Sequence, residues 1–313
     1  MSLSFQSLTA RLMRGAAGVA LGLGLTIAAL PQQALAYEAA AETPAAGSGP
    51  ALFIVRDHDS TIYLMGTVHL MRPGDDWARP EIRQAFDASS ELWLEITNVD
   101  DQAAAAPLIQ QYGLSPQTPL SSRLSAEENA RLAQVAGELG LTPQALEPMR
   151  PWLAGLLLTN LSLQKVGFDP SQGIDMVVRG WAREADKPVR GLEQMEDQIR
   201  LFAEMPEEAQ LGFLRQSMDN AEEGVALLDR MADAWRRGDH ETLDSAALAE
   251  MRRDEPAFYA AMFTARNANW VNQIQEMLSG SGTSFIAVGA GHLAGPDSVQ
   301  AMLEQRGVTV ERR

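Results

Sequence analysis

The chain has 313 residues, with 25 Lys and Arg against 41 Asp and Glu, which gives a net charge of −16 at pH 7. An acidic surface repels phosphate backbones and anionic lipid, so the composition argues against nucleic acid as a partner. The sequence contains no cysteine, which excludes disulfides, a thiolate nucleophile and thiolate metal ligands.

The first 36 residues have the layout of a secretory signal: Arg11 and Arg14 precede an apolar run over 16–30, and the small residues Ala34–Ala36 form a cleavage site. The apolar run is short for a membrane span, so cleavage after Ala36 is favoured over a retained anchor. Cleavage removes two arginines and no acid, which leaves 23 basic and 41 acidic residues and a net charge of −18. We therefore expect an exported protein, periplasmic or secreted, with no stable membrane anchor.

A single domain is expected over 51–313. Before it, residues 37–50 are small, rich in Pro and Gly and without periodic apolar positions, so they predict a flexible lead. Two β-prone runs, Leu52–Val55 and Thr61–Met65, flank the polar turn 57–60 and predict an opening hairpin.

Helix and strand patterns follow along the chain. Pro80 begins a short helix, and residues 91–96 alternate acidic and apolar side chains as a strand does. Ser125 and Glu128 form a capping box at the start of another helix. Residues 152–163 are apolar on most sides, which is typical of a helix buried in a core.

The second half of the chain is mainly helical. A helix over 173–185 leads to a short strand over 189–192, and residues 194–281 are almost continuously helical in pattern. Breaks in that stretch are expected at Pro206, Gly224, Gly238 and Pro256. The last expected elements are a strand over 284–288, a helix over 296–305 and a strand over 308–310. The pattern predicts an α/β fold, with a mixed central sheet covered by a large helical layer or lobe.

Two Gly-x-x-His segments, Gly66–His69 and Gly289–His292, each follow directly on a predicted strand. Ligands bind at the carboxyl ends of strands in α/β sheets, where glycine lets the backbone turn sharply and approach a ligand closely. We therefore expect His69 and His292 to meet in one site.

Two histidines do not complete a metal site, so a carboxylate is expected to join them. Glu95 is the first candidate because it ends an apolar strand, where an acid is costly to bury without a partner; the alternative is an edge-strand acid that faces water. Imidazole and carboxylate without thiolate do not select sharply among Mn, Co and Zn.

Three further residues are candidates for catalysis. Glu193 ends another strand and is a candidate ligand or general base, or else an acid that stabilises the dipole of the following helix. Arg266 heads an apolar helical stripe and precedes Asn267, so its guanidinium would point inward, toward Glu95 or a developing oxyanion, or else cover the core with its stem. His58 and His240 lie in polar clusters and are expected at the surface.

In their order and spacing these motifs resemble the TraB/PrgY/GumN family: Gly66–Leu70, Glu95, Gly173–Asp175, Gly191–Glu193, Arg266–Asn267 and Val288–Leu293. The resemblance covers about residues 51–311. It implies an α/β fold with both Gly-x-x-His motifs in the active centre, similar to the Tiki metalloproteases and to erythromycin-esterase-like and haem-binding ChaN-like proteins. It also implies site roles for His69, His292, Glu95, Arg266 and Asn267.

The function expected from these residues is metal-dependent hydrolysis of a peptide or ester. His69, His292 and Glu95 would hold a divalent ion with an open position, Glu193 or another acid beside the site would take the proton, and Arg266 would stabilise negative charge. The alternative is a protein that binds a metal, haem or small ligand without turnover, for which the resemblance implies a role accessory to envelope polysaccharide synthesis.

Overall fold

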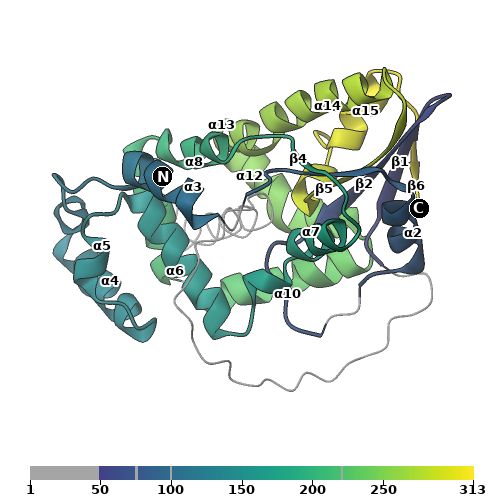
Figure 1. Cartoon of the computed structure of the whole chain (residues 1–313). Coiled ribbons are helices and arrows are strands. Elements are labelled where there is room, and N and C mark those ends of the chain that lie inside the picture. Colours follow the sequence, from purple (N-terminus) through teal and green to yellow (C-terminus); the bar gives the residue numbers. More distant parts are fainter. Residues whose placement is uncertain (1–48, 75–76, 99–100, 220) are drawn as a thin grey trace.

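The structure, a computed structural model, describes residues 49–74, 77–98, 101–219 and 221–313 (Figure 1). The predicted signal peptide and the lead as far as residue 48 lie outside the described residues. Within the part that is described, no helix has the length and apolar character needed to cross a membrane.

Six strands form one mixed sheet in the order β4-β3-β5-β2-β1-β6. They are β1 (Leu52–Arg56), β2 (Ser60–Thr67), β3 (Glu91–Leu94), β4 (Val189–Gly191), β5 (Gly282–Gly289) and β6 (Val310–Arg312). The predicted opening hairpin is confirmed, because β1 pairs antiparallel with β2. Strands β4, β3, β5 and β2 are mutually parallel, so their carboxyl ends meet at one edge of the sheet.

Helices cover both faces of this sheet, which makes three layers (Figure 1). One face carries α14 (Ala265–Leu278) and α15 (Val299–Gln305), and the other carries α2 (Pro80–Ala88), α7 (Ile174–Glu184) and α10 (Ala221–Arg236). Alternate residues of β5 supply the two cores, since successive side chains of a strand point to opposite faces. Ile286 and Val288 join the core that contains Trp270, whereas Phe285 joins the core that contains Phe86.

A helical lobe lies beside the sheet, on the left in Figure 1. Its main elements are α3 (Gln102–Leu108), η1 (Ile109–Gly113), η2 (Leu120–Arg123), α4 (Ala126–Glu138), α5 (Pro143–Leu146), α6 (Pro151–Lys165), α8 (Met195–Ala203) and α9 (Glu207–Asp219). The predicted capping box at Ser125 and Glu128 is present at the start of α4. The predicted core helix is α6, which is buried on most sides and packs against α9.

The remaining elements are short segments between these helices and strands. They are η3 (Pro170–Gln172), α11 (His240–Leu243), η4 (Asp244–Leu248), α12 (Ala249–Asp254), α13 (Pro256–Tyr259), η5 (Ala260–Thr264) and η6 (Ala290–Leu293). Helix boundaries at Pro206, Gly238 and Pro256 are as expected, but the break predicted at Gly224 is wrong, because α10 runs through it. Glycine costs a helix only about 1 kcal/mol relative to alanine, and the buried face with Leu227, Leu228 and Met231 outweighs that cost.

The predicted elements near the carboxyl terminus begin later than expected. Helix α15 begins at Val299 rather than Pro296, since Ser298 is its N-cap. The last strand begins at Val310, because the backbone N–H of Val308 still donates to the Leu303 carbonyl at the end of α15, at 3.0 Å.

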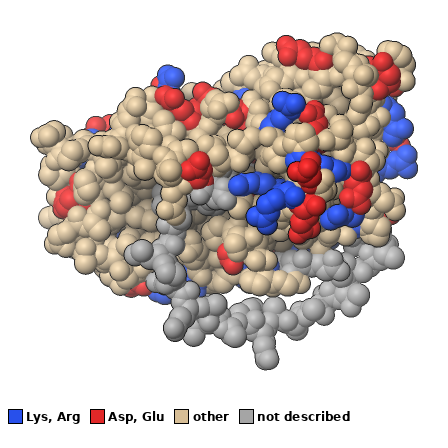
Figure 2. Space-filling view, viewed as in Figure 1, with Lys and Arg blue, Asp and Glu red and all other residues tan. Residues whose placement is uncertain are grey.

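Charged side chains of both signs gather side by side on the face drawn in Figure 2. Ion pairs between partly exposed side chains of the protein include Arg190 with Glu91 at 2.7 Å and Arg83 with Asp87 at 3.0 Å. Exposed pairs of this kind contribute little to stability. This face therefore presents no broad surface of one sign.

Candidate active site

The four parallel strands each end beside a polar residue of the predicted site. In sheet order, β4 is followed by Glu193, β3 by Glu95, β5 by His292 and β2 by His69. Trp235 of α10 donates to the carbonyl of Gly66 at 2.7 Å and fixes the end of β2. The strand ends thus deliver four candidate side chains to one edge of the sheet.

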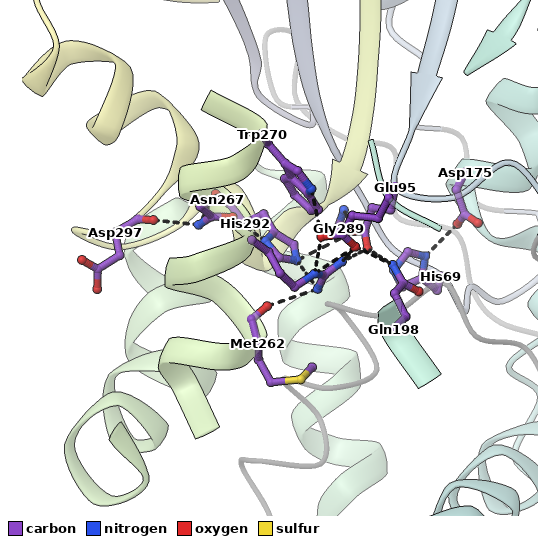
Figure 3. A network of polar contacts seen from close by, with 12 residues as sticks. His69, Glu95, Asp175, Gln198, Met262, Asn267, Trp270, Gly289, His292 and Asp297 are labelled. Atoms are coloured by element: carbon purple, nitrogen blue, oxygen red, sulfur yellow. Dashed lines mark hydrogen bonds and ion pairs between the residues drawn. The ribbon is translucent and has the colours of Figure 1, made fainter. Parts of the chain in front are cut away.

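His69 is paired with Asp175, which lies in the first turn of α7 (Figure 3). The Nδ1 atom of His69 lies 3.0 Å from Asp175 Oδ1, and because a carboxylate only accepts, Nδ1 carries the proton. The two segments are in backbone contact, since the N–H of Ile174 donates to the Val68 carbonyl at 2.9 Å. The Nε2 atom of His69 is buried and has no hydrogen-bond partner.

The environment of His69 favours its protonated form. Burial by itself lowers the pKa of an imidazole, but the charge and hydrogen bond of Asp175, together with the charge of Glu95, outweigh burial and raise the pKa of His69 above its ordinary value of 6.5. The site around His69 is therefore electronegative.

His292 is fully buried between the rings of Phe263 and Trp270, whose centroids lie 5.0 and 4.3 Å from its own. Its Nε2 lies 3.0 Å from Arg266 Nη1 and its Nδ1 lies 2.6 Å from Asn267 Oδ1 (Figure 3). A guanidinium only donates, so Nε2 of His292 accepts and the ring is neutral with its proton on Nδ1. Asn267 donates in turn to the Asp297 carbonyl at 2.7 Å, which fixes its amide.

Arg266 is buried at the start of α14 and uses all five of its N–H groups. Nε and Nη2 donate to Glu193 at 2.9 and 2.8 Å, and Nη2 also donates to Glu95 Oε2 at 2.6 Å. Nη1 faces the Met262 carbonyl at 3.1 Å and His292 at 3.0 Å. The guanidinium therefore has no spare donor for an oxyanion.

Glu95 lies at the centre of these contacts. Its Oε2 accepts from Arg266 and from Gln198 Nε2, the latter at 3.0 Å, and its Oε1 accepts from the backbone N–H of Gly289 at 2.7 Å. Each carboxylate oxygen has two acceptor positions, so Oε1 keeps one for a further ligand or proton. Its distance from His292 Nε2 is 3.9 Å.

Glu193 faces donors on both oxygens. Besides Arg266, Trp270 Nε1 donates to its Oε1 at 3.0 Å and Gln198 Nε2 lies 3.3 Å from its Oε2. In this arrangement Glu193 orients Arg266 rather than offering a free oxygen for proton transfer.

Three buried polar atoms of residues at or beside the strand ends have no hydrogen-bond partner: Thr67 Oγ1, His69 Nε2 and Gln198 Oε1. Gln198 touches Glu95 directly, and Thr67 is the register partner of Gly289, whose N–H binds Glu95. In the view of Figure 3, Gln198 and His69 are both drawn to the right of His292. Buried polar atoms are normally satisfied, so such a group points to a ligand, water or ion.

The structure thus gathers His292, Glu95, Glu193, Arg266 and Asn267 into one network, with His69 beside it. It does not place the ligand atoms of His69, Glu95 and His292 within 4.8 Å of one another. Among the described residues, three exposed ones meet that criterion and could hold a metal ion, namely Asp57, His58 and Asp59. In the structure, Asp57 Oδ1 instead accepts from the backbone N–H groups of Ser60 and Asp59, as in a turn.

Asp175 and Gln198 received no role from the sequence, although each carries a signal. Asp175 shares a helix face with Val178 and Ala182, all buried in α7. Gln198 lies in the buried stripe of α8 with apolar residues on either side, Met195, Ile199 and Phe202. A polar residue within an apolar stripe is expected to have a buried partner.

His240 was expected at the surface, and the structure shows it only partly exposed. Its ring packs edge-on against Phe53 at 5.2 Å. Burial lowers the pKa of His240 to about 4. The local sequence is polar, but the chain folds back so that β1 covers the ring.

Fold and site together define a mixed α/β protein with a buried ionic network at the carboxyl ends of its parallel strands. The family model described as the TraB/PrgY/gumN family matches residues 51–312, and the chain belongs to this family. The resemblance seen in the motifs is thereby confirmed.

The relatives are distant in sequence but similar in extent. The chain is 24% identical over 258 residues to the uncharacterized protein YbaP of Escherichia coli (strain K12), which covers 81% of this chain and 92% of that protein. It is 20% identical over 267 residues to an uncharacterized protein of Treponema pallidum (strain Nichols), covering 80% of this chain and 79% of that protein. No solved structure matches the chain, so the likeness to Tiki, erythromycin-esterase-like and ChaN-like folds stays a prediction.

Proposed function

We propose that this protein is an exported metal-dependent hydrolase of peptides or esters, with its ion on the His69 side of Glu95. The observation that carries the proposal is the group of three buried atoms without partners, Thr67 Oγ1, His69 Nε2 and Gln198 Oε1. Together with a carboxylate, an imidazole nitrogen, an amide oxygen and a hydroxyl would supply donors for Mn²⁺, Co²⁺ or Zn²⁺.

The second shell of His69 supports the same proposal. Histidines that bind metals usually donate their other N–H to a carboxylate, which fixes the tautomer and orients the ring. Asp175 does this at His69 Nδ1 and leaves Nε2 as the atom that would bind the ion.

The balance of charge in the site also supports the proposed metal ion. With their carboxylates ionised and His69 neutral, as a metal-binding imidazole is, Asp175, Glu95 and Glu193 carry three negative charges against one positive charge on Arg266. Buried charge of this kind requires compensation, and a divalent cation would supply it.

A bound ion would acidify a water molecule toward neutral pH and polarise a substrate carbonyl. Glu95 Oε1, with one acceptor position left, would take a proton at that atom. Arg266 would keep Glu95 oriented, held in place itself by Glu193 and Met262.

The same donors would serve a protein that binds a metal without turnover. The observation that favours this second function is the saturation of Arg266, which leaves no N–H for the negative charge that develops in hydrolysis.

Metal analysis of the purified protein, together with hydrolysis of a panel of peptides and esters, tests the proposal. We expect about one divalent ion per chain and hydrolysis that stops when the ion is chelated, with both lost in His69→Ala. His58→Ala is the matched control, because His58 belongs to the exposed group with Asp57 and Asp59. An ion kept in His69→Ala and lost in His58→Ala would place the metal at that exposed turn, and metal binding without turnover would favour the second function.

A further inference from the structure

Glu95, Glu193 and His292 carry the kinds of group that bind metals, but their ligand atoms do not all lie within 4.8 Å of one another in the structure. Two carboxylates and one imidazole form a common ligand set for divalent transition metals. All three side chains are at most about one-tenth exposed, at 4% for Glu95, 11% for Glu193 and 0% for His292. The sequence led us to expect an ion shared by His292 and Glu95.

A guanidinium already binds this ligand set. Arg266 reaches Glu95 at 2.6 Å, Glu193 at 2.8 Å and His292 Nε2 at 3.0 Å. The Nε2 lone pair that would bind an ion accepts a hydrogen bond instead, since a guanidinium offers only donors. Trp270 closes the centre, with the guanidinium carbon 4.9 Å from its ring centroid.

Its chemistry makes arginine a permanent cation in this position. A guanidinium stays charged at all physiological pH values, and its planar fork matches two carboxylates at once. Burial disfavours the charge, but Glu95 and Glu193 outweigh burial and raise the pKa of Arg266 above its ordinary value.

We infer that Arg266 is the resident cation of this centre and excludes a divalent ion from Glu95, Glu193 and His292. A divalent ion that this protein binds is therefore not held by His292. Removal of the guanidinium leaves two carboxylates facing a neutral imidazole, a buried cluster that requires a cation. The side chain of Arg266 then no longer competes with a divalent ion for these three groups.

Metal titration of Arg266→Ala tests the inference without any activity assay. The probe is Mn²⁺ or Zn²⁺ alone, followed by equilibrium dialysis and metal analysis beside the unmodified protein. We expect Arg266→Ala to bind one ion more per chain than the unmodified protein. Methylguanidinium at millimolar concentration should displace this additional ion, because it restores the original cation.

Two matched variants show where the additional ion binds. Arg266→Lys keeps a positive charge and should gain no ion, and Glu193→Gln combined with Arg266→Ala should lose the gain. An unchanged ion count in folded Arg266→Ala would overturn the inference.

If Arg266→Ala does not fold, with or without metal, the inference is tested instead with Glu193→Gln in a chain that keeps Arg266. The inference expects its ion count to be unchanged, and the loss of an ion would overturn it. The ion count of these variants is independent of the test of the proposed function, which measures the ion lost in His69→Ala. A protein with no native ion that gains one in Arg266→Ala would contradict the proposed function and support this inference.

Discussion

Asp175 orients His69 from a helix more than a hundred residues further along the chain, with Oδ1 3.0 Å from Nδ1. This contact leaves Nε2 of His69 as the one ring nitrogen available to a ligand. The roles proposed for His69 therefore depend on Asp175.

Replacement of Asp175 by Asn should weaken metal binding about 10- to 100-fold, because the carboxylate that fixes the tautomer of His69 is lost. Isothermal titration with Mn²⁺ or Zn²⁺ measures this effect. Asp87→Asn is a control, since Asp87 forms an exposed pair with Arg83. Equal affinity in Asp175→Asn and the unmodified protein would remove Asp175 from the site.

The same substitution should change how His69 titrates in metal-free protein. The pKa of His69 lies above 6.5 while Asp175 is charged, so His69 adds stability that is present below pH 6.5 and is lost as the pH rises through the raised value. In Asp175→Asn burial should prevail and bring the pKa of His69 below 6.5. An NMR titration of the His69 ring in the presence of a chelator measures both values, and an unshifted midpoint would contradict this account.

Gly173 is the position where the backbone of His69 comes closest to α7. A Cβ atom at Gly173 would lie 2.5 Å from the carbonyl oxygen of His69, and backbone of this kind cannot move aside cheaply. Gly173→Ala should therefore destabilise the protein by about 1–3 kcal/mol, as overpacking does, and weaken metal binding.

Gly180→Ala on the same helix is the matched control, because nothing lies within 4 Å of its added Cβ. It should stabilise the protein by about 0.5–1 kcal/mol. Urea denaturation of the two variants measures the contrast, and equal effects would show that the contact with His69 is not tight.

The positions of Glu95 and His292 could be predicted because they depend on local pattern. An apolar strand that ends in an acid or a glycine predicts which side chain lies at the strand end, and parallel pairing then brings the ends together. The inward direction of Arg266 followed in the same way from the apolar stripe on its helix.

The partners within the site could not be predicted, since they depend on how helices dock. Nothing local to His69 selects Asp175, and nothing local to Glu95 selects Gln198; both contacts follow from the packing of α7 and α8 on the sheet. The saturation of Arg266 is also a property of the assembled site, because its partners come from four separate segments. The partial burial of His240 was not predicted for the same reason, since Phe53 packs against its ring only in the folded chain.

We expect Asn267 to contribute to the stability of the protein through its hydrogen bond with His292. Its Oδ1 accepts the proton on His292 Nδ1 at 2.6 Å, so Asn267→Ala leaves a buried donor unpaired at a cost of about 1–3 kcal/mol. Asn272→Ala, at an exposed position of the same helix, should change stability by less than about 0.5 kcal/mol. Urea denaturation distinguishes the two, and a loss in Asn267→Ala no larger than that in Asn272→Ala would show that His292 does not depend on this contact.

His240 should make the protein less stable in acid. Burial lowers its folded pKa to about 4 from the ordinary 6.5, so the unfolded chain binds a proton between these values and the folded chain does not. Stability present above pH 6.5 is therefore lost as the pH falls toward 4.

Denaturation in urea across this range should show a smaller loss of stability in His240→Gln than in the unmodified protein. His58→Gln is the control because its side chain is 86% exposed, and it should leave the slope unchanged. An equal slope in His240→Gln would mean that the buried ring does not resist protonation, and the acid sensitivity would then belong to the carboxylates.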